Sequence, residues 1–181
     1  MKPQWLKYRE EILSSLDRWD GKSVEALEGL YRNYSANDDF AKVLEDWADS
    51  VSTSIKLQNA LSHLLKQHCD NGYIVLAKQS HSILSVLENE PHWQTLLHIL
   101  QSFKSFELVE EYRDSWERIL KSALSCENKF VRAWSYYAWA LFADHFPRYG
   151  PEVNDYIEMA LRDEAPSVKA RIRQMQKQGL I

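Results

Sequence analysis

The side chains best suited to metal or acid–base chemistry in this sequence are its six histidines and two cysteines. His63 and His68 are five positions apart, which places them roughly 140° apart around a helix. His92 and His98 are six apart and diverge in the same way. Neither the His-Glu-x-x-His nor the His-x-x-Glu-His zinc pattern occurs. Because no ligand set converges, we expect no metal site.

The sequence also contains no motif that indicates covalent catalysis. Cys69 and Cys126 are each predicted near a helix C-terminus, where the helix dipole raises the pKa of a thiol. A Gly-x-Ser-x-Gly elbow is missing, and five scattered glycines form no phosphate-binding loop. We therefore expect no catalytic residue, no cofactor and a non-enzymatic role.

Aromatic residues are unusually frequent, with seven Trp, nine Tyr and six Phe. In the predicted helix 129–146, two opposite faces are both apolar. We assign one stripe to the core: Phe130, Trp134, Tyr137, Ala138, Leu141 and His145. Arg132, Tyr136 and Trp139 fall on the opposite face. Two interpretations of that face stay open, namely packing against adjacent helices with Arg132 over the rings, or a platform for a partner.

Basic residues gather near the end of the chain. Lys169, Arg171 and Arg173 lie on the predicted helix 166–178, and Lys177 follows them. Such a run is either a solvated helix face that complements its own C-terminus or a contact for an anionic partner. Lys169, Arg171 and Arg173 are therefore candidate partner-binding residues.

The elements that must position these residues are all predicted to be helices. The chain has 181 residues, 45 % hydrophobic and 27 % charged, and only five Gly and five Pro, which argues against a loop-rich β-sandwich. No segment alternates cleanly in the manner of a strand. Apolar periodicity with Pro at helix starts and Gly after helix ends predicts helices over 4–18, 23–34, 38–51, 54–69, 73–88, 91–103, 107–124, 129–146, 151–162 and 166–178.

Four of these helices recur at a regular interval. They begin near Ser54, Pro91, Lys129 and Pro166, at intervals of 37, 38 and 37 residues. A bundle of similar helices also gives such spacing, but 128–133 and 165–170 match position by position, each with Val, a base and Ala opening a helix. This pattern resembles the first-helix start of HEAT repeats. The segment 128–178 is also similar to small bacterial HEAT-like proteins of unassigned activity.

The resemblance implies an all-α, right-handed α-α superhelix of about ten helices. We expect a single domain over 1–181, with 1–51 as a cap or degenerate repeats and the best-formed repeats in 54–178. Val and Ala of each repeat start would pack inward and the base would lie at the edge. A continuous apolar seam is predicted to contain Leu61, Leu64, Leu96, Ile99, Leu120, Trp134, Leu141 and Leu161.

In HEAT solenoids the second helix of each repeat lines the concave side. Here the resemblance assigns that position to 107–124 and 151–162, which are rich in acids. Glu110, Glu111, Asp114 and Glu117 are therefore further candidate partner-binding residues. Such a groove would attract a basic peptide and repel nucleic acid.

Taken together, these features predict a non-catalytic interaction or scaffold module that presents a repeat groove to another protein or peptide. The alternative is a DNA glycosylase of the HEAT-like alkylation-repair class, whose members use Trp and Asp near the lesion. Trp116 with Asp114 and Trp139 with Asp144 fit that composition, but the net charge of −4 does not favour DNA. Two cysteines, no apolar signal segment and no apolar run of membrane-spanning length predict a cytoplasmic location.

Overall fold

The computed structural model describes residues 4–45 and 54–181, and these residues are helical without a strand, as predicted. One isolated bridge pairs Val75 with Phe106. The α-helices are α1 (Gln4–Asp17), α2 (Val24–Tyr34), α3 (Asp39–Glu45), α5 (Ile55–Asp70), α6 (Ala77–Leu87), α7 (Trp93–Ser102), α8 (Arg113–Leu124), α9 (Lys129–His145), α10 (Gly150–Asp163) and α11 (Pro166–Lys177). Three short 3₁₀ helices, Phe103–Ser105, Glu110–Tyr112 and Pro147–Tyr149, join them. The last part of the helix predicted over 38–51 lies outside the described residues.

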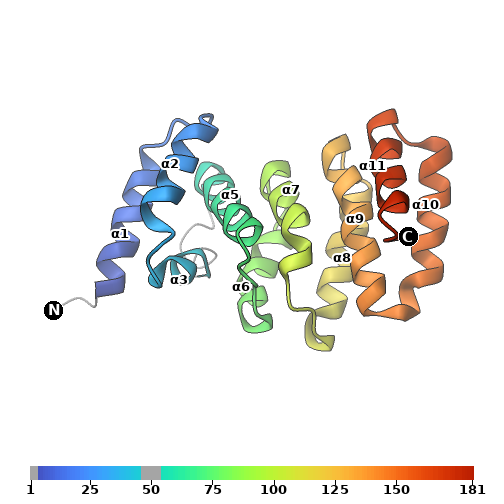
Figure 1. Cartoon of the computed structure of the whole chain (residues 1–181), viewed down its shortest axis with the longest axis horizontal. Coiled ribbons are helices and arrows are strands. Elements are labelled where there is room, and N and C mark those ends of the chain that lie inside the picture. The colour runs from blue at the N-terminus through green and yellow to red at the C-terminus, as the bar shows by residue number, and fades with distance from the viewer. Residues whose placement is uncertain (1–3, 46–53) are drawn as a thin grey trace.

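From α1 to α9 the helices run along the long axis of the molecule broadly in chain order, and α11 lies between α9 and α10, which forms the far end (Figure 1). In one row α2, α5, α7, α9 and α11 each pack on the next. In the other row α1, α3, α6 and α8 do the same, and α10 packs on α9 and α11. The four helices predicted to begin at the repeat interval are thus neighbours in one row, as the repeat interpretation requires. The right-handed superhelix stays a prediction.

Local capping explains several of the helix starts. The hydroxyl oxygen of Ser23 accepts a hydrogen bond from the backbone N–H of Ala26, and that of Ser54 accepts one from Leu57. The side chain of Asn128 accepts from the N–H of Phe130 at the start of α9. These side chains satisfy amide groups that have no partner within the helix, so each helix begins where its cap stands.

Two predicted helices begin later than expected. The N–H of Val75 donates to the carbonyl of Ser105 at 2.8 Å, and the N–H of Glu107 donates to the carbonyl of Val75 at 2.9 Å. Because these backbone groups pair across the chain, the residues around Val75 and Glu107 cannot make helical bonds. Helix α6 therefore begins at Ala77, and α8 begins at Arg113 after a 3₁₀ turn.

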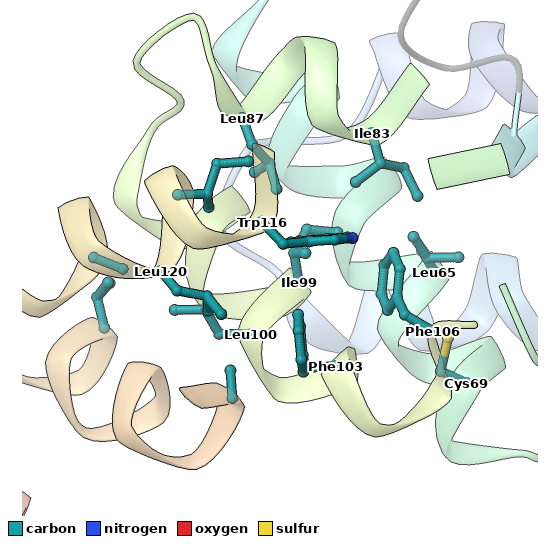
Figure 2. Packing of buried hydrophobic residues seen from close by; sticks show 14 of the residues in the cluster. Leu65, Cys69, Ile83, Leu87, Ile99, Leu100, Phe103, Phe106, Trp116 and Leu120 are labelled. Carbon is teal, nitrogen blue, oxygen red and sulfur yellow. The ribbon is translucent and has the colours of Figure 1, made fainter. Parts of the chain in front are cut away.

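The core runs between the two rows and contains a cluster of three aromatic rings in its middle section. Trp116 of α8 meets Phe103 and Phe106 edge-on, with ring centroids 5.1 and 5.2 Å apart (Figure 2). Aliphatic side chains of α5, α6, α7 and α8 surround these rings: Leu65, Ile83, Leu87, Ile99, Leu100 and Leu120. This packing fixes the spacing of α5, α6, α7 and α8.

The predicted apolar seam is only half buried. Leu61, Leu64, Ile99 and Leu120 are fully buried, whereas Leu96, Trp134, Leu141 and Leu161 are partly exposed. Val131 and Val168, the paired valines of the two repeat starts, are both completely buried. The phase predicted for the repeat starts is therefore confirmed at the valines, but Ala133 is buried and Ala170 is exposed.

Candidate functional site

The aromatic helix α9 faces the opposite way from our assignment. Tyr136 and Trp139 are buried, at 7 % and 1 % exposure, so a platform formed by these two rings is ruled out. The stripe assigned to the core instead contains the exposed Phe130 and the half-buried Trp134 and Tyr137. Helix α9 packs on α7, α8, α10 and α11, and the Trp139 ring contacts the rings of Tyr149 and Tyr156. Apolar periodicity alone could not tell which face of α9 is buried, because both faces are apolar.

Arg132 is also a structural residue rather than a free contact. Its Nε and one terminal nitrogen donate to the two carboxylate oxygens of Glu164, at 2.7 and 3.0 Å. The other terminal nitrogen donates to the carbonyls of Cys126 and Glu127. This side chain therefore ties the start of α9 to the turn before it and to the turn between α10 and α11. The hydrogen bond from Arg132 lowers the pKa of Glu164.

Arg171 of α11 lies in a different environment. Its guanidinium carbon is 3.6 Å from the centre of the Trp134 ring and 5.0 Å from that of Tyr137. One terminal nitrogen donates to Gln174 at 3.1 Å, while the buried Nε has no partner. Within residues 4–45 and 54–181, no carboxylate forms an ion pair with this guanidinium, and burial lowers the pKa of Arg171.

A cavity of about 380 Å³ opens beside this stack. Its lining comes from α5, α7, α9 and α11 and the segments that follow α7 and α11: Lys66, Asp70, Gln101, Lys104, Trp134, Tyr137, Arg171 and Gln178. We call these residues the Arg171 groove. Three bases face one acid, and Lys66 already binds that acid, Asp70, at 2.6 Å. Arg171 and the exposed Lys104 leave the groove with positive charge next to two aromatic rings.

The other two basic candidates differ from Arg171. Lys169 donates to the carbonyl of Arg162 at 2.6 Å, which closes the turn between α10 and α11. Arg173 is exposed, and it is absent from the residues that line the groove. Of the predicted basic triplet, only Arg171 therefore enters the groove.

The acidic candidates are largely paired within their own row. Glu110 binds both Arg113 and Arg148, and Arg113 also holds Asp114. Glu117 accepts from Lys121 at 2.7 Å and from the hydroxyl of Tyr149 at 2.6 Å, and these two bonds lower its pKa. Glu111 is exposed. Because most of these carboxylates already have cationic partners, the surface offers a basic peptide little unpaired charge.

The Trp–Asp pairs considered for base excision are not available to DNA. Trp116 and Trp139 are each 1 % exposed, and the indole N–H of each is buried without a hydrogen-bond partner in the part of the chain that the structure describes. A ring in this position cannot stack on a nucleobase without unpacking the core.

The described residues hold few groups suited to other chemistry. They contain no cluster of three or more His, Cys, Asp or Glu side chains that could bind a metal ion. Cys69 is buried, and burial raises the pKa of its thiol to about 11. In the same part of the chain, no helix is long and apolar enough to cross a membrane.

The groove was missed at the sequence level although a signal for it exists. Trp134 and Arg171 are 37 residues apart, which is the repeat interval, and they lie side by side on α9 and α11. Residues one repeat apart therefore meet across the row. Scans against protein-family models, curated proteins and solved structures found no match to this chain.

Proposed function

We propose that this chain is a non-catalytic protein-interaction module that binds an acidic segment of another protein in the Arg171 groove. The observation that carries the proposal is the guanidinium of Arg171, which is partly buried and stacked on Trp134 but has no carboxylate partner among the described residues. A partly desolvated cation attracts a carboxylate more strongly than a solvated one.

Stacking also prepares Arg171 for binding. The flat contact with Trp134 restricts the long side chain, so a partner loses less conformational freedom when it engages the guanidinium edge. Trp134 and Tyr137 offer apolar contact area beside the charge, and aromatic and arginine side chains dominate the energetics of most interfaces. Gln101 and Gln178 line the same cavity and can bond the backbone of an extended segment.

The charge of the partner follows from the contrast between the two rows. Glu110 and the acids of α8 bind bases of α8 and of the 3₁₀ helix that follows α9, and Lys121 of α8 also binds Glu152 of α10. Arg171 forms no ion pair with any described residue. An acidic peptide therefore gains a new ion pair in the groove, and a basic peptide would have to displace existing ones. This reasoning replaces the basic partner expected from the sequence with an acidic one.

Fluorescence anisotropy tests the proposal with three labelled probes of similar size: a Glu- and Gly-containing peptide with one Trp, its Lys counterpart, and duplex DNA. We expect saturable binding of the acidic peptide alone, weakened by salt. Arg171→Gln should reduce that affinity about tenfold, while the matched surface change Arg173→Gln should not alter it. Preferential binding of the Lys peptide contradicts the proposal, and preferential binding of DNA favours the glycosylase alternative.

A further inference from the structure

A second cavity, of about 290 Å³, lies at the other end of the repeat row, between α2, α5 and α7. It is distinct from the Arg171 groove and shares no lining residue with it. One wall is apolar and includes Trp19, Val24 and Leu27, and the other carries Asn59, His63, Gln94 and His98. Small-ligand sites combine an apolar wall with a few fixed polar groups in this way, and their volumes begin near 300 Å³.

The polar wall is held rigid by a hydrogen-bond network between α5 and α7. The hydroxyl of Thr95 donates to Oδ1 of Asn59 at 2.8 Å, and Nδ2 of Asn59 donates to Oε1 of Gln94 at 3.0 Å. Nδ2 also reaches Nδ1 of His92 at 3.2 Å, so both oxygen and nitrogen of this buried amide are used. Because Oε1 of Gln94 accepts from Asn59, the orientation of the Gln94 amide is fixed, and its NH₂ group is left as a donor.

The same network favours one tautomer of His98. When the Ser62 hydroxyl donates to the carbonyl of Asn59 at 3.0 Å, its oxygen accepts from Nδ1 of His98 at 2.9 Å. In that arrangement the proton of the neutral ring is on Nδ1, and Nε2 is a hydrogen-bond acceptor. Burial lowers the pKa of His98 to about 3, with His63 and Lys66 adding to the effect. The acceptor is thus present across the physiological pH range.

Charges of both signs surround the cavity, which gives an ionic ligand no clear advantage. Lys22 lines the cavity and the positive charge of Lys66 acts on both histidines, while Glu28 and Asp70 act on His63 in the opposite direction. His63 contacts His98 edge-on, with ring centroids 5.3 Å apart, and its buried Nε2 has no hydrogen-bond partner among residues 4–45 and 54–181. The α5–α7 interface thus contains hydrogen-bonding capacity that the protein does not use, and such unused groups are uncommon in stable packing.

From these observations we infer that the cavity between α2, α5 and α7 binds a small, neutral, planar heterocycle with an amide edge. An N–H of the ligand would donate to Nε2 of His98, and a ligand carbonyl would accept from the Gln94 amide. The ring would lie against Trp19, Val24 and Leu27. A lactam or carboxamide carries that donor and acceptor side by side on one flat edge, which suits two groups fixed on a single helix.

Protein-observed NMR tests the inference with uracil and nicotinamide as probes and 1,3-dimethyluracil as the matched control. Dimethyluracil has the same ring and carbonyls but no N–H donor. We expect saturable shifts confined to residues of α2, α5 and α7 for both probes in the millimolar range, and affinity for dimethyluracil at least about tenfold lower. Equal binding of dimethyluracil would mean an apolar cavity without the proposed recognition, and the absence of saturable shifts for both probes would overturn the inference.

Two substitutions separate the acceptor and donor contributions. His98→Asn keeps a donor for Ser62 but removes Nε2, and Gln94→Glu keeps the oxygen that accepts from Asn59 but removes the NH₂ group. Each should weaken uracil binding about tenfold, whereas His81→Asn on the exposed side of α6 should leave it unchanged. Unchanged affinity in both site variants, with folding confirmed by their amide spectra, would contradict the assignment.

Discussion

Two arginines one helix apart show how differently the repeat row uses the same side chain. Arg132, at the start of α9, is bound at both ends of its guanidinium by Glu164 and by two carbonyls. Arg171, in α11, lies on an aromatic surface and has one side-chain hydrogen bond, to Gln174. The hydrogen bond to the carboxylate of Glu164 raises the pKa of Arg132, whereas burial lowers the pKa of Arg171.

This difference indicates that Arg132 stabilises the fold, whereas the guanidinium of Arg171 can accept a new partner. Arg132 already has the partners that stabilise a partly buried guanidinium, so a protein ligand would gain little from it. Arg171 has the cost of partial burial, and no described residue forms an ion pair that would offset it. The start of α9 is therefore a region of folding stability, and the Arg171 groove is the region where we propose that a partner binds.

The largest expected effect tests whether α9 and α11 are equivalent helices at all. Val131 and Val168 are both fully buried at matching repeat positions. Val131→Asp and Val168→Asp should each lower the free energy of unfolding by roughly 3–5 kcal/mol, because each places an unpaired carboxylate in the core. Urea denaturation followed by circular dichroism measures this. A small loss at one position and a large loss at the other would mean that the repeat phase fails there.

The next effect isolates Arg132. Its side chain and that of Glu164 are 21 % and 14 % exposed, so the pair is only partly screened by water. Arg132→Ala should cost about 1–3 kcal/mol of stability and leave acidic-peptide affinity unchanged. This loss of stability is larger than expected from the sequence, which placed Arg132 at the solvated edge of the helix. Lys169→Ala, at the equivalent position of α11, is the matched control and should cost less, since Lys169 makes a single bond to a carbonyl.

Acid should remove the contribution of Arg132. The pKa of Glu164 is lowered from its ordinary value of 4.5 by Arg132. The unfolded state therefore binds the proton more readily, and the stabilisation is present above that value and lost as pH falls through the folded-state pKa. The stability difference between wild type and Arg132→Ala should shrink below about pH 4. A difference that stays constant down to acid unfolding would mean that the ion pair contributes nothing.

The smallest effect on stability belongs to Arg171. Arg171→Ala removes the contact with Trp134 but breaks no ion pair, so it should cost about 0.5–1 kcal/mol. Thermal melts of the Arg171→Ala and Arg132→Ala variants measure which substitution destabilises the protein more. A larger loss for Arg171 than for Arg132 would reverse the comparison and make Arg171 a structural residue.

Much of the fold could be predicted from the sequence because helix caps and apolar periodicity act locally. The starts of α5, α9 and α11 and the burial of both repeat valines follow from such signals. The orientation of α9 could not be predicted, because both of its faces are apolar and only its contacts with four other helices decide between them. Arg171 was a candidate from charge alone, but its ring partners come from the adjacent repeat.

The most direct test of the account is to locate acidic-peptide binding by NMR. The Trp134 indole N–H and the amides around Arg171 are the reporters for the groove, and the amides around Glu117 are the reporters for the opposite row. We predict that the Glu-containing peptide shifts the Trp134 indole signal and residues of α9 and α11 in a saturable, salt-sensitive manner. Shifts centred on α8 and α10, with Trp134 unmoved, would contradict the assignment of the Arg171 groove as the binding face.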